Sequence, residues 1–97
     1  MGEEQLQRAA DAAMLPIVAS LGAVGVVSAH WLPDRAGEPV VWVRVKDEAS
    51  RVAVQSYSWV LPQVQIILTR LAVPPEMVMR LRIEVTSAEA EDRLFEG

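Results

Sequence analysis

The side chains that most often perform catalysis are sparse in this sequence, whose single histidine is His30. Ser28 precedes it by two residues and Asp34 follows by four, so a serine, a histidine and an acid stand close together. A nucleophilic serine usually lies on a glycine-flanked turn that exposes its hydroxyl, and no serine here has such neighbours. Asp34 and Glu38 could form an acid–base pair, but their segment is typical of a turn. We therefore expect that this protein is not an enzyme.

Few residues of the chain are suited to bind a cofactor or a metal ion. Without cysteine the chain has no thiolate nucleophile, disulfide, cysteine-ligated zinc or iron–sulfur cluster, which fits the reducing cytoplasm where we expect the protein. One histidine does not bind zinc unless the fold places carboxylates beside it. Gly22 and Gly25 lack the further glycines of a nucleotide-binding loop. We expect no cofactor, no metal and no small-molecule substrate.

Length and charge restrict the partners. The 97 residues are enough for one domain, residues 1–97, and 52% of them are hydrophobic, which argues against disorder. The net charge is −4 and Lys46 is the single lysine. Bulk electrostatic binding of a polyanion needs clustered basic residues, so nucleic acid is not the first expectation. We expect instead a protein partner or a second copy of the chain.

The stretch from Ala12 to Pro33 has no acidic or basic residue besides His30, and it is long enough to span a membrane. A membrane anchor and a secretion signal are therefore alternatives. Against them, Pro16, Gly22 and Gly25 interrupt a single helix, and the chain begins with acidic rather than basic residues. We expect instead a soluble helix followed by a strand.

The elements that would position any site follow from periodicity. Residues 1–22 have an apolar stripe at helical spacing, with Gly22 as the expected stop and Pro16 as a kink or a break near Leu15. Residues 24–46 are expected to form an antiparallel hairpin with a turn at residues 33–38. In its second strand Val41, Val43 and Val45 should face the core and Val40, Trp42, Arg44 and Lys46 should face outward.

Residues 47–73 are expected to form a proline-kinked helix or a helix pair. Asp47 suits the N-cap, and the second helix would begin at Pro62. The apolar positions recur at steps of three and four residues, which is typical of a helix: Ala53, Tyr57, Val60, Val64, Ile67 and Leu71. A strand over residues 51–59 remains an alternative.

The C-terminal part alternates and then becomes acidic. Residues 77–86 are predicted to form a strand whose core side carries Met77, Met79, Leu81, Ile83 and Val85. Residues 87–97 are predicted to form an acidic C-terminal helix or tail with Leu94 and Phe95, because Thr86 to Glu89 has the pattern of a capping box. The sequence thus indicates an α+β fold, a two-layer sandwich of order αββαβ(α). Its three-stranded mixed sheet would have helices on one face.

The opposite face of that sheet would gather aromatic and basic side chains. The ordinary interpretation is a polar outer face on which arginine stems cover apolar surface. The sharper one is a protein interface, because tryptophan and arginine often anchor such contacts and an open sheet edge can accept a second copy. On that interpretation the chain is an adaptor or assembly module that self-associates through its sheet. The candidate partner-binding residues are Trp31, Trp42, Arg44, Lys46, Arg80 and Arg82.

A nucleic-acid function is the alternative. The order of elements is similar to that of KH-type RNA-binding domains, and Gly22-Ala23-Val24-Gly25 matches their GxxG motif. The resemblance implies that single-stranded nucleic acid would stack on the outer sheet face. In KH domains, however, the motif joins two helices and is usually basic. The order is also similar to that of the C-terminal domain of iron–sulfur scaffold proteins and of small bacterial envelope domains, which are likenesses of fold alone.

Overall fold

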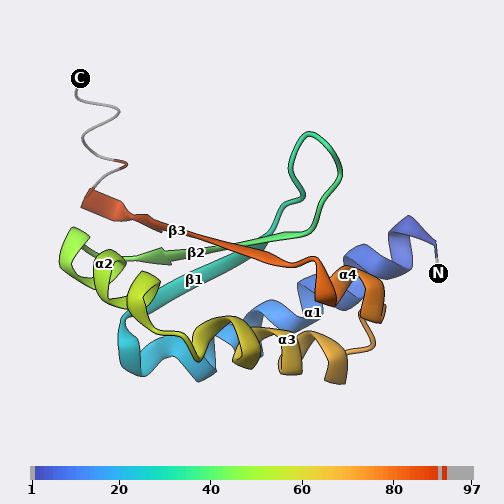
Figure 1. Cartoon of the computed structure of the whole chain (residues 1–97), viewed down its shortest axis with the longest axis horizontal. Coiled ribbons are helices and arrows are strands. Elements are labelled where there is room, and N and C mark those ends of the chain that lie inside the picture. The colour runs from blue at the N-terminus through green and yellow to red at the C-terminus, as the bar shows by residue number, and fades with distance from the viewer. Residues whose placement is uncertain (1, 90, 92–97) are drawn as a thin grey trace.

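The computed structural model describes residues 2–89 and 91, and its elements follow the order helix, strand, strand, three helices, strand (Figure 1). The helices are α1 (Glu3–Leu21), α2 (Glu48–Ser56), α3 (Val60–Arg70) and α4 (Pro75–Met79), with a 3-10 turn, η1 (Gly22–Val24), after α1. The strands are β1 (Val26–Trp31), β2 (Val40–Val45) and β3 (Arg82–Ser87).

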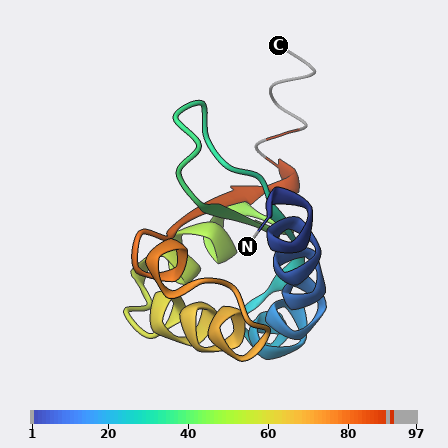
Figure 2. The same ribbon diagram turned by 90° about the vertical axis from the view of Figure 1, so that its right-hand side faces the viewer.

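The three strands form one mixed sheet in the order β1-β2-β3. β1 and β2 are antiparallel, and β2 and β3 are parallel. The helices lie on one side of the sheet, and the loop that joins β1 to β2 rises on the other side (Figures 1 and 2). The predicted α+β class and the mixed sheet are therefore confirmed.

The core lies between the sheet and the helices. Val41, Val43 and Val45 of β2 are fully buried, as predicted. The stripe of α1 that faces β1 and α3 is buried as well, and its two alanines let the helix approach the sheet closely: Ala10, Ala13, Ile17 and Leu21. Each fully buried aliphatic side chain contributes about 1.5–3 kcal/mol, so this layer stabilises the fold far more than the charged surface does.

The apolar stretch from residue 12 to residue 33 divides into the end of α1, η1, β1 and the first residues of the following loop. α1 continues unbroken through Pro16, so the expected break near Leu15 is wrong. Pro16 and Ala12 both lie on the exposed side, where water can hydrogen-bond to the carbonyl that proline leaves without a partner. Among the described residues, no helix is long and apolar enough to cross a membrane.

α1 ends at Leu21 with Gly22 as its C-cap, as predicted, and the glycine with positive φ between α1 and β1 is Gly25. Gly22 has right-handed backbone angles and continues the helical turn, whereas Gly25 has φ of 101°. Any Cβ at Gly25 would also lie 3.4 Å from Oγ of Ser50. That separation is an ordinary contact, so glycine is favoured at this position for its backbone conformation.

The segment 47–73 is a helix pair, so the alternative strand over residues 51–59 is wrong. Asp47 caps α2 by accepting a hydrogen bond from the amide of Ser50 at 2.8 Å, as predicted. The break falls before Val60, and Pro62 is the third residue of α3 rather than its first. Tyr57 lies in the break and is exposed, so Val54 supplies the core contact expected from it.

The predicted strand over residues 77–86 begins late, at Arg82. Pro75 occupies the first position of α4, where its fixed φ favours a helical turn, and residues 75–79 are therefore helical. In consequence Val78 is buried and Met79 is 81% exposed, the reverse of the expected alternation. Leu81 is buried at the entry to β3, and Ile83 and Val85 are half-buried.

The predicted C-terminal helix lies partly outside the described residues. Ala88 and Glu89 are helical, whereas residues 92–97, with Leu94 and Phe95, fall outside the described part. The carboxylate of Glu89 accepts a hydrogen bond from the amide of Glu48 at 3.1 Å. The residues after β3 therefore contact the first turn of α2.

Replacement of Leu21 by alanine should lower the free energy of unfolding by about 2–5 kcal/mol, because it leaves a cavity under β1 and β2. Leu15→Ala on the same helix is the matched control, since Leu15 is 78% exposed, and it should change stability by less than about 0.5 kcal/mol. Urea denaturation followed by circular dichroism measures both. Equal effects of the two substitutions would contradict the placement of α1.

Candidate functional site

The outer face of the sheet is the side turned away from the helices. The strand register places His30 beside Trp42 and Trp42 beside Glu84. One step along, Arg44 lies between Ser28 and Thr86. Aromatic, basic and acidic side chains thus alternate across three strands on this face.

The structure brings three of the six candidate partner-binding residues onto the outer face: Trp42, Arg44 and Arg82. Trp31 does not join them, because it faces the core and is 5% exposed, and His30 occupies the outer position of β1 instead. Lys46 is exposed just beyond the end of β2. Arg80 follows α4 rather than lying in a strand.

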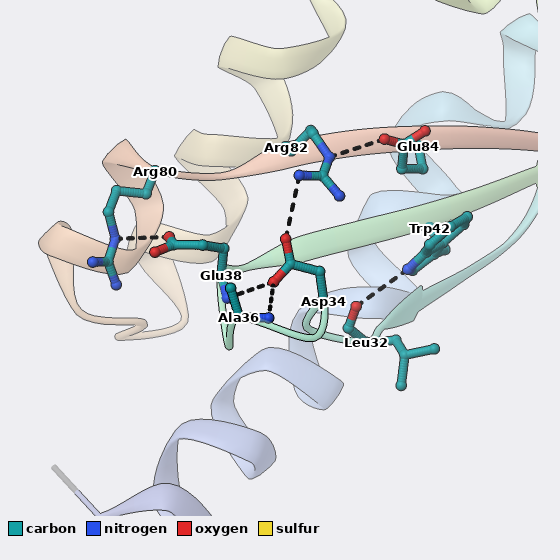
Figure 3. A network of polar contacts seen from close by, with 8 residues as sticks. All are labelled: Leu32, Asp34, Ala36, Glu38, Trp42, Arg80, Arg82 and Glu84. Carbon is teal, nitrogen blue, oxygen red and sulfur yellow. Dashed lines mark hydrogen bonds and ion pairs between the residues drawn. The ribbon is translucent and has the colours of Figure 1, made fainter.

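The arginines of this surface are paired with carboxylates (Figure 3). Nε of Arg82 donates to Oε1 of Glu84 at 2.9 Å, and Nη1 of Arg82 lies 3.4 Å from Oδ2 of Asp34. Nε of Arg80 lies 3.3 Å from Oε2 of Glu38. The basic side chains expected here are therefore neutralised at these arginines, by Asp34 and Glu38 from a distant part of the sequence and by Glu84 of the same strand.

Asp34 organises the loop between β1 and β2. Its Oδ1 accepts hydrogen bonds from the amides of Ala36 at 2.9 Å and of Glu38 at 3.0 Å (Figure 3). These bonds, the one from Glu38 foremost, and the Arg82 guanidinium lower the pKa of the Asp34 carboxyl below its usual value. At the base of the loop Val40 lies opposite Arg82, on the outer side as predicted, and it is nevertheless fully buried.

Trp42 is held against the same loop. Its indole Nε1 donates to the carbonyl of Leu32 at 3.2 Å (Figure 3). A hollow of about 390 Å³ beside it is lined by His30, Trp42, Arg44, Thr86 and Glu91, among others. Nε of Arg44 lies 2.9 Å from Oε2 of Glu91, so the basic group of the hollow is also paired. The outer face therefore holds its own loop and the residues after β3 in place.

The possible catalytic trio is not assembled. The carboxylate of Asp34 faces Arg82 and two loop amides, while His30 lies beside Trp42 in the sheet. Within residues 2–89 and 91, no group of three or more histidine, aspartate or glutamate side chains is placed to hold a metal ion.

A second surface lies at the edge of β3. The sequence indicated an open sheet edge, but neither this strand nor the residues beside it. The amide of Arg82 donates to the carbonyl of Pro39 at 3.1 Å, so its backbone faces the chain that leads into β2. Because backbone groups alternate along a strand, those of Ile83 and Val85 face away from β2. β3 ends the strand order, and in the described part of the chain no strand pairs with this side of it.

An apolar groove of about 320 Å³ runs beneath this edge. Leu81, Ile83 and Val85 form one wall, and residues of α2, α3 and their connection form the other, among them Val54, Tyr57 and Leu61. In Figure 1 β3 extends along the sheet with α2 and α3 below it. Since Ile83 and Val85 are half-buried, the groove exposes the margin of the core.

Two aromatic rings stand beside the groove. Tyr57 and Trp59 stack with ring centroids 5.7 Å apart, and Tyr57 is 40% exposed. The periodic apolar spacing includes Tyr57, so the sequence predicts a buried position for it, and the structure instead places it between α2 and α3.

No family model matches this chain, and the comparisons with curated proteins and with solved structures found no significant similarity. The geometry and chemistry of these two surfaces therefore carry the functional inference.

The acid stability of the protein should depend in part on Asp34. Because folding lowers its pKa below 3.8, Asp34 stabilises the fold above that pH, and the contribution is lost as the pH falls through the lowered pKa. Asp34→Asn should therefore lower stability at pH 7 and flatten the decline of stability between about pH 5 and pH 2. Asp47, whose pKa the Ser50 amide also lowers, keeps part of the decline in that variant.

Urea denaturation at a series of pH values measures the effect, and an NMR titration gives the pKa of Asp34 directly. Asp11→Asn, at an exposed position of α1, is the control and should keep the wild-type profile. A titration of Asp34 at or above 3.8 would refute its role as the organiser of the loop.

Proposed function

We propose that this protein is a non-enzymatic protein–protein interaction module, an adaptor or assembly unit that self-associates through its sheet. The free edge of β3 beside an apolar groove carries this proposal. Outward-facing backbone groups on an edge strand bind a further strand, and pockets beside the edge take its side chains.

The difference between the two edges of the sheet supports β3 as the binding edge. β1 has a register irregularity between Val26 and Ser28, and α1 packs against that strand. Bulges and covering helices are devices that prevent edge pairing. The register of β3 with β2 is regular, and its core-side residues, Ile83 and Val85, carry no charge. In consequence β3 lacks the irregularity that β1 has, although α2 packs against β3 as α1 packs against β1.

The groove adds apolar contact to the main-chain pairing. Tyr57 and Leu61 on one wall and Ile83 on the other are partly exposed side chains of the kinds that make interface contacts. Aromatic residues in particular are enriched among those that dominate binding energy. Arg82 lines the groove and also reaches the outer face, so one of the predicted interface residues belongs to this surface.

A KH-like function, in which nucleic acid binds the outer face, has weaker support. A phosphate would have to displace Asp34, Glu84 or Glu38 from the arginines they pair with. Gly22 to Gly25 form a turn between a helix and a strand, whereas the KH motif joins two helices. We therefore place the contact at the β3 edge and expect a protein partner, in the first instance the chain itself.

Self-association predicts a molar mass that rises with concentration from that of a monomer to that of a dimer. Light scattering coupled to size-exclusion chromatography measures it. Ile83→Lys places a charge in the groove and should leave a monomer, whereas Val27→Lys, at a 55% exposed position of the other edge, should keep the dimer. Tyr57→Glu tests the groove from its helical wall and should also weaken the dimer.

Circular dichroism shows whether each variant is folded before its mass is interpreted. A wild-type monomer at every concentration would refute self-association. Binding of labelled single-stranded RNA at low salt, abolished in Arg82→Glu, would instead favour the nucleic-acid alternative.

A further inference from the structure

The β3 edge also restricts how a second copy can dock. We propose that two copies pair their β3 strands antiparallel about a two-fold axis, with Ile83 opposite Ile83 and with Arg82 of each copy opposite Glu84 of the other. This inference rests on the proposed self-association and specifies its geometry.

Symmetry sets the direction of pairing. Most homodimers have a two-fold axis, and each copy then contributes the same surface. An axis perpendicular to the sheet pairs two identical edges antiparallel and keeps the inner faces of both copies on one side. The two apolar grooves then lie side by side under a continuous six-stranded sheet, in the order β1-β2-β3-β3-β2-β1.

Backbone orientation limits the register. Ile83 and Val85 present both their amide and their carbonyl at the free edge, whereas the amide of Leu81 is already bonded to the carbonyl of Val78 at 3.2 Å. A slip by one residue would bring an outward-facing group against an inward-facing one. Three registers pair Ile83 and Val85 with each other or with themselves: Ile83 opposite Ile83, Ile83 opposite Val85, and Val85 opposite Val85.

Charge on the outer face distinguishes these three. With Ile83 opposite Ile83, Arg82 faces Glu84 of the partner, and by symmetry this pair occurs twice. With Ile83 opposite Val85, Glu84 faces Glu84, which is a repulsive pair. With Val85 opposite Val85, Glu84 faces Thr86 and Arg82 gains no carboxylate. The first register alone is complementary in charge.

The side chains already stand in position for this exchange. Arg82 and Glu84 of one copy are half-exposed and adjacent, with Nε of Arg82 2.9 Å from Oε1 of Glu84. A second strand would let each of them add or exchange a partner without leaving the outer face. On the inner face Ile83 would meet Ile83, and Val85 would meet Leu81 of the other copy, at the mouth of the groove.

Single-cysteine variants measure the register directly, because the chain has no cysteine of its own. In the proposed register the two Cα atoms at position 83 are about 5.5 Å apart, a separation that a disulfide can bridge. Those at position 85 are offset by four residues, about 13 Å. We expect Ile83→Cys to form a disulfide-linked dimer under mild oxidation, and Val85→Cys and Glu84→Cys to form much less.

Val27→Cys at the opposite edge measures the background of random collision, and non-reducing electrophoresis with mass spectrometry identifies the products. Strongest cross-linking through Glu84→Cys or Val85→Cys in a wild-type-like dimer would overturn the register and leave self-association intact. A wild-type monomer at all concentrations would remove the proposed function itself, so the two failures are distinguishable.

Charge reversal provides a second test. Arg82→Glu and Glu84→Arg should each raise the dimer Kd at least about tenfold, because two attractive pairs become repulsive. An equimolar mixture of the two variants should recover the wild-type Kd, since every cross-strand pair is then oppositely charged. Glu84→Arg keeps the bond from Arg82 to Asp34, which Arg82→Glu removes. A loss of dimer confined to Arg82→Glu would trace the effect to the loop, and it would contradict the proposal, as would a mixture that shows no recovery.

Discussion

Backbone hydrogen bonding along β2 is the interaction on which the rest of the structure depends. Both pairings of the sheet include β2, which is antiparallel to β1 and parallel to β3. Its residues Val41, Val43 and Val45 form the centre of the core, so the same strand fixes the sheet and anchors the helices. A sheet with one central strand has two edge strands. Whether each edge is covered, irregular or open determines whether it can bind a further strand.

The two faces of the sheet have different roles. On the inner face aliphatic packing supplies most of the stability. Arg82 on the outer face and Arg80 after α4 bind carboxylates of the β1–β2 loop, and Trp42 bonds to the backbone of Leu32. These exposed pairs contribute little energy individually, but together they fix the loop over one end of the sheet. A partly exposed apolar groove also lies at the edge, under β3.

Much of the fold could be predicted from periodicity. The stripe of α1, the hairpin and the parallel placement of β3 follow from apolar spacing and from the short connections. The strand prediction for residues 77–79 was wrong because a short apolar alternation is compatible with a strand and with a single helical turn. Pro75, as the first residue of α4, favours the helical turn. The prediction for Tyr57 was wrong because the helical spacing of apolar residues continues past the end of α2, where Tyr57 leaves the helix.

The candidate site was harder to predict than the fold. Arg82 and Asp34 are 48 residues apart, so the neutralisation of the outer face depends on tertiary structure that local patterns do not contain. Trp31 and His30 are adjacent, and a shift of one residue in the strand exchanges which of them faces the core. The strand order identifies β3 as an edge strand. The partial burial of Ile83 and Val85 is also needed to identify that edge as a candidate binding surface.

The most direct test of the central claim is the hydrogen exchange of individual backbone amides, measured by NMR on the unmodified protein across a range of concentrations. The account predicts that the amides of Ile83 and Val85 exchange rapidly in dilute solution and become protected as the concentration rises, while those of β1 do not change. Protection that is independent of concentration, or that rises at β1 or around Trp42 instead, would contradict the assignment of β3 as the binding edge.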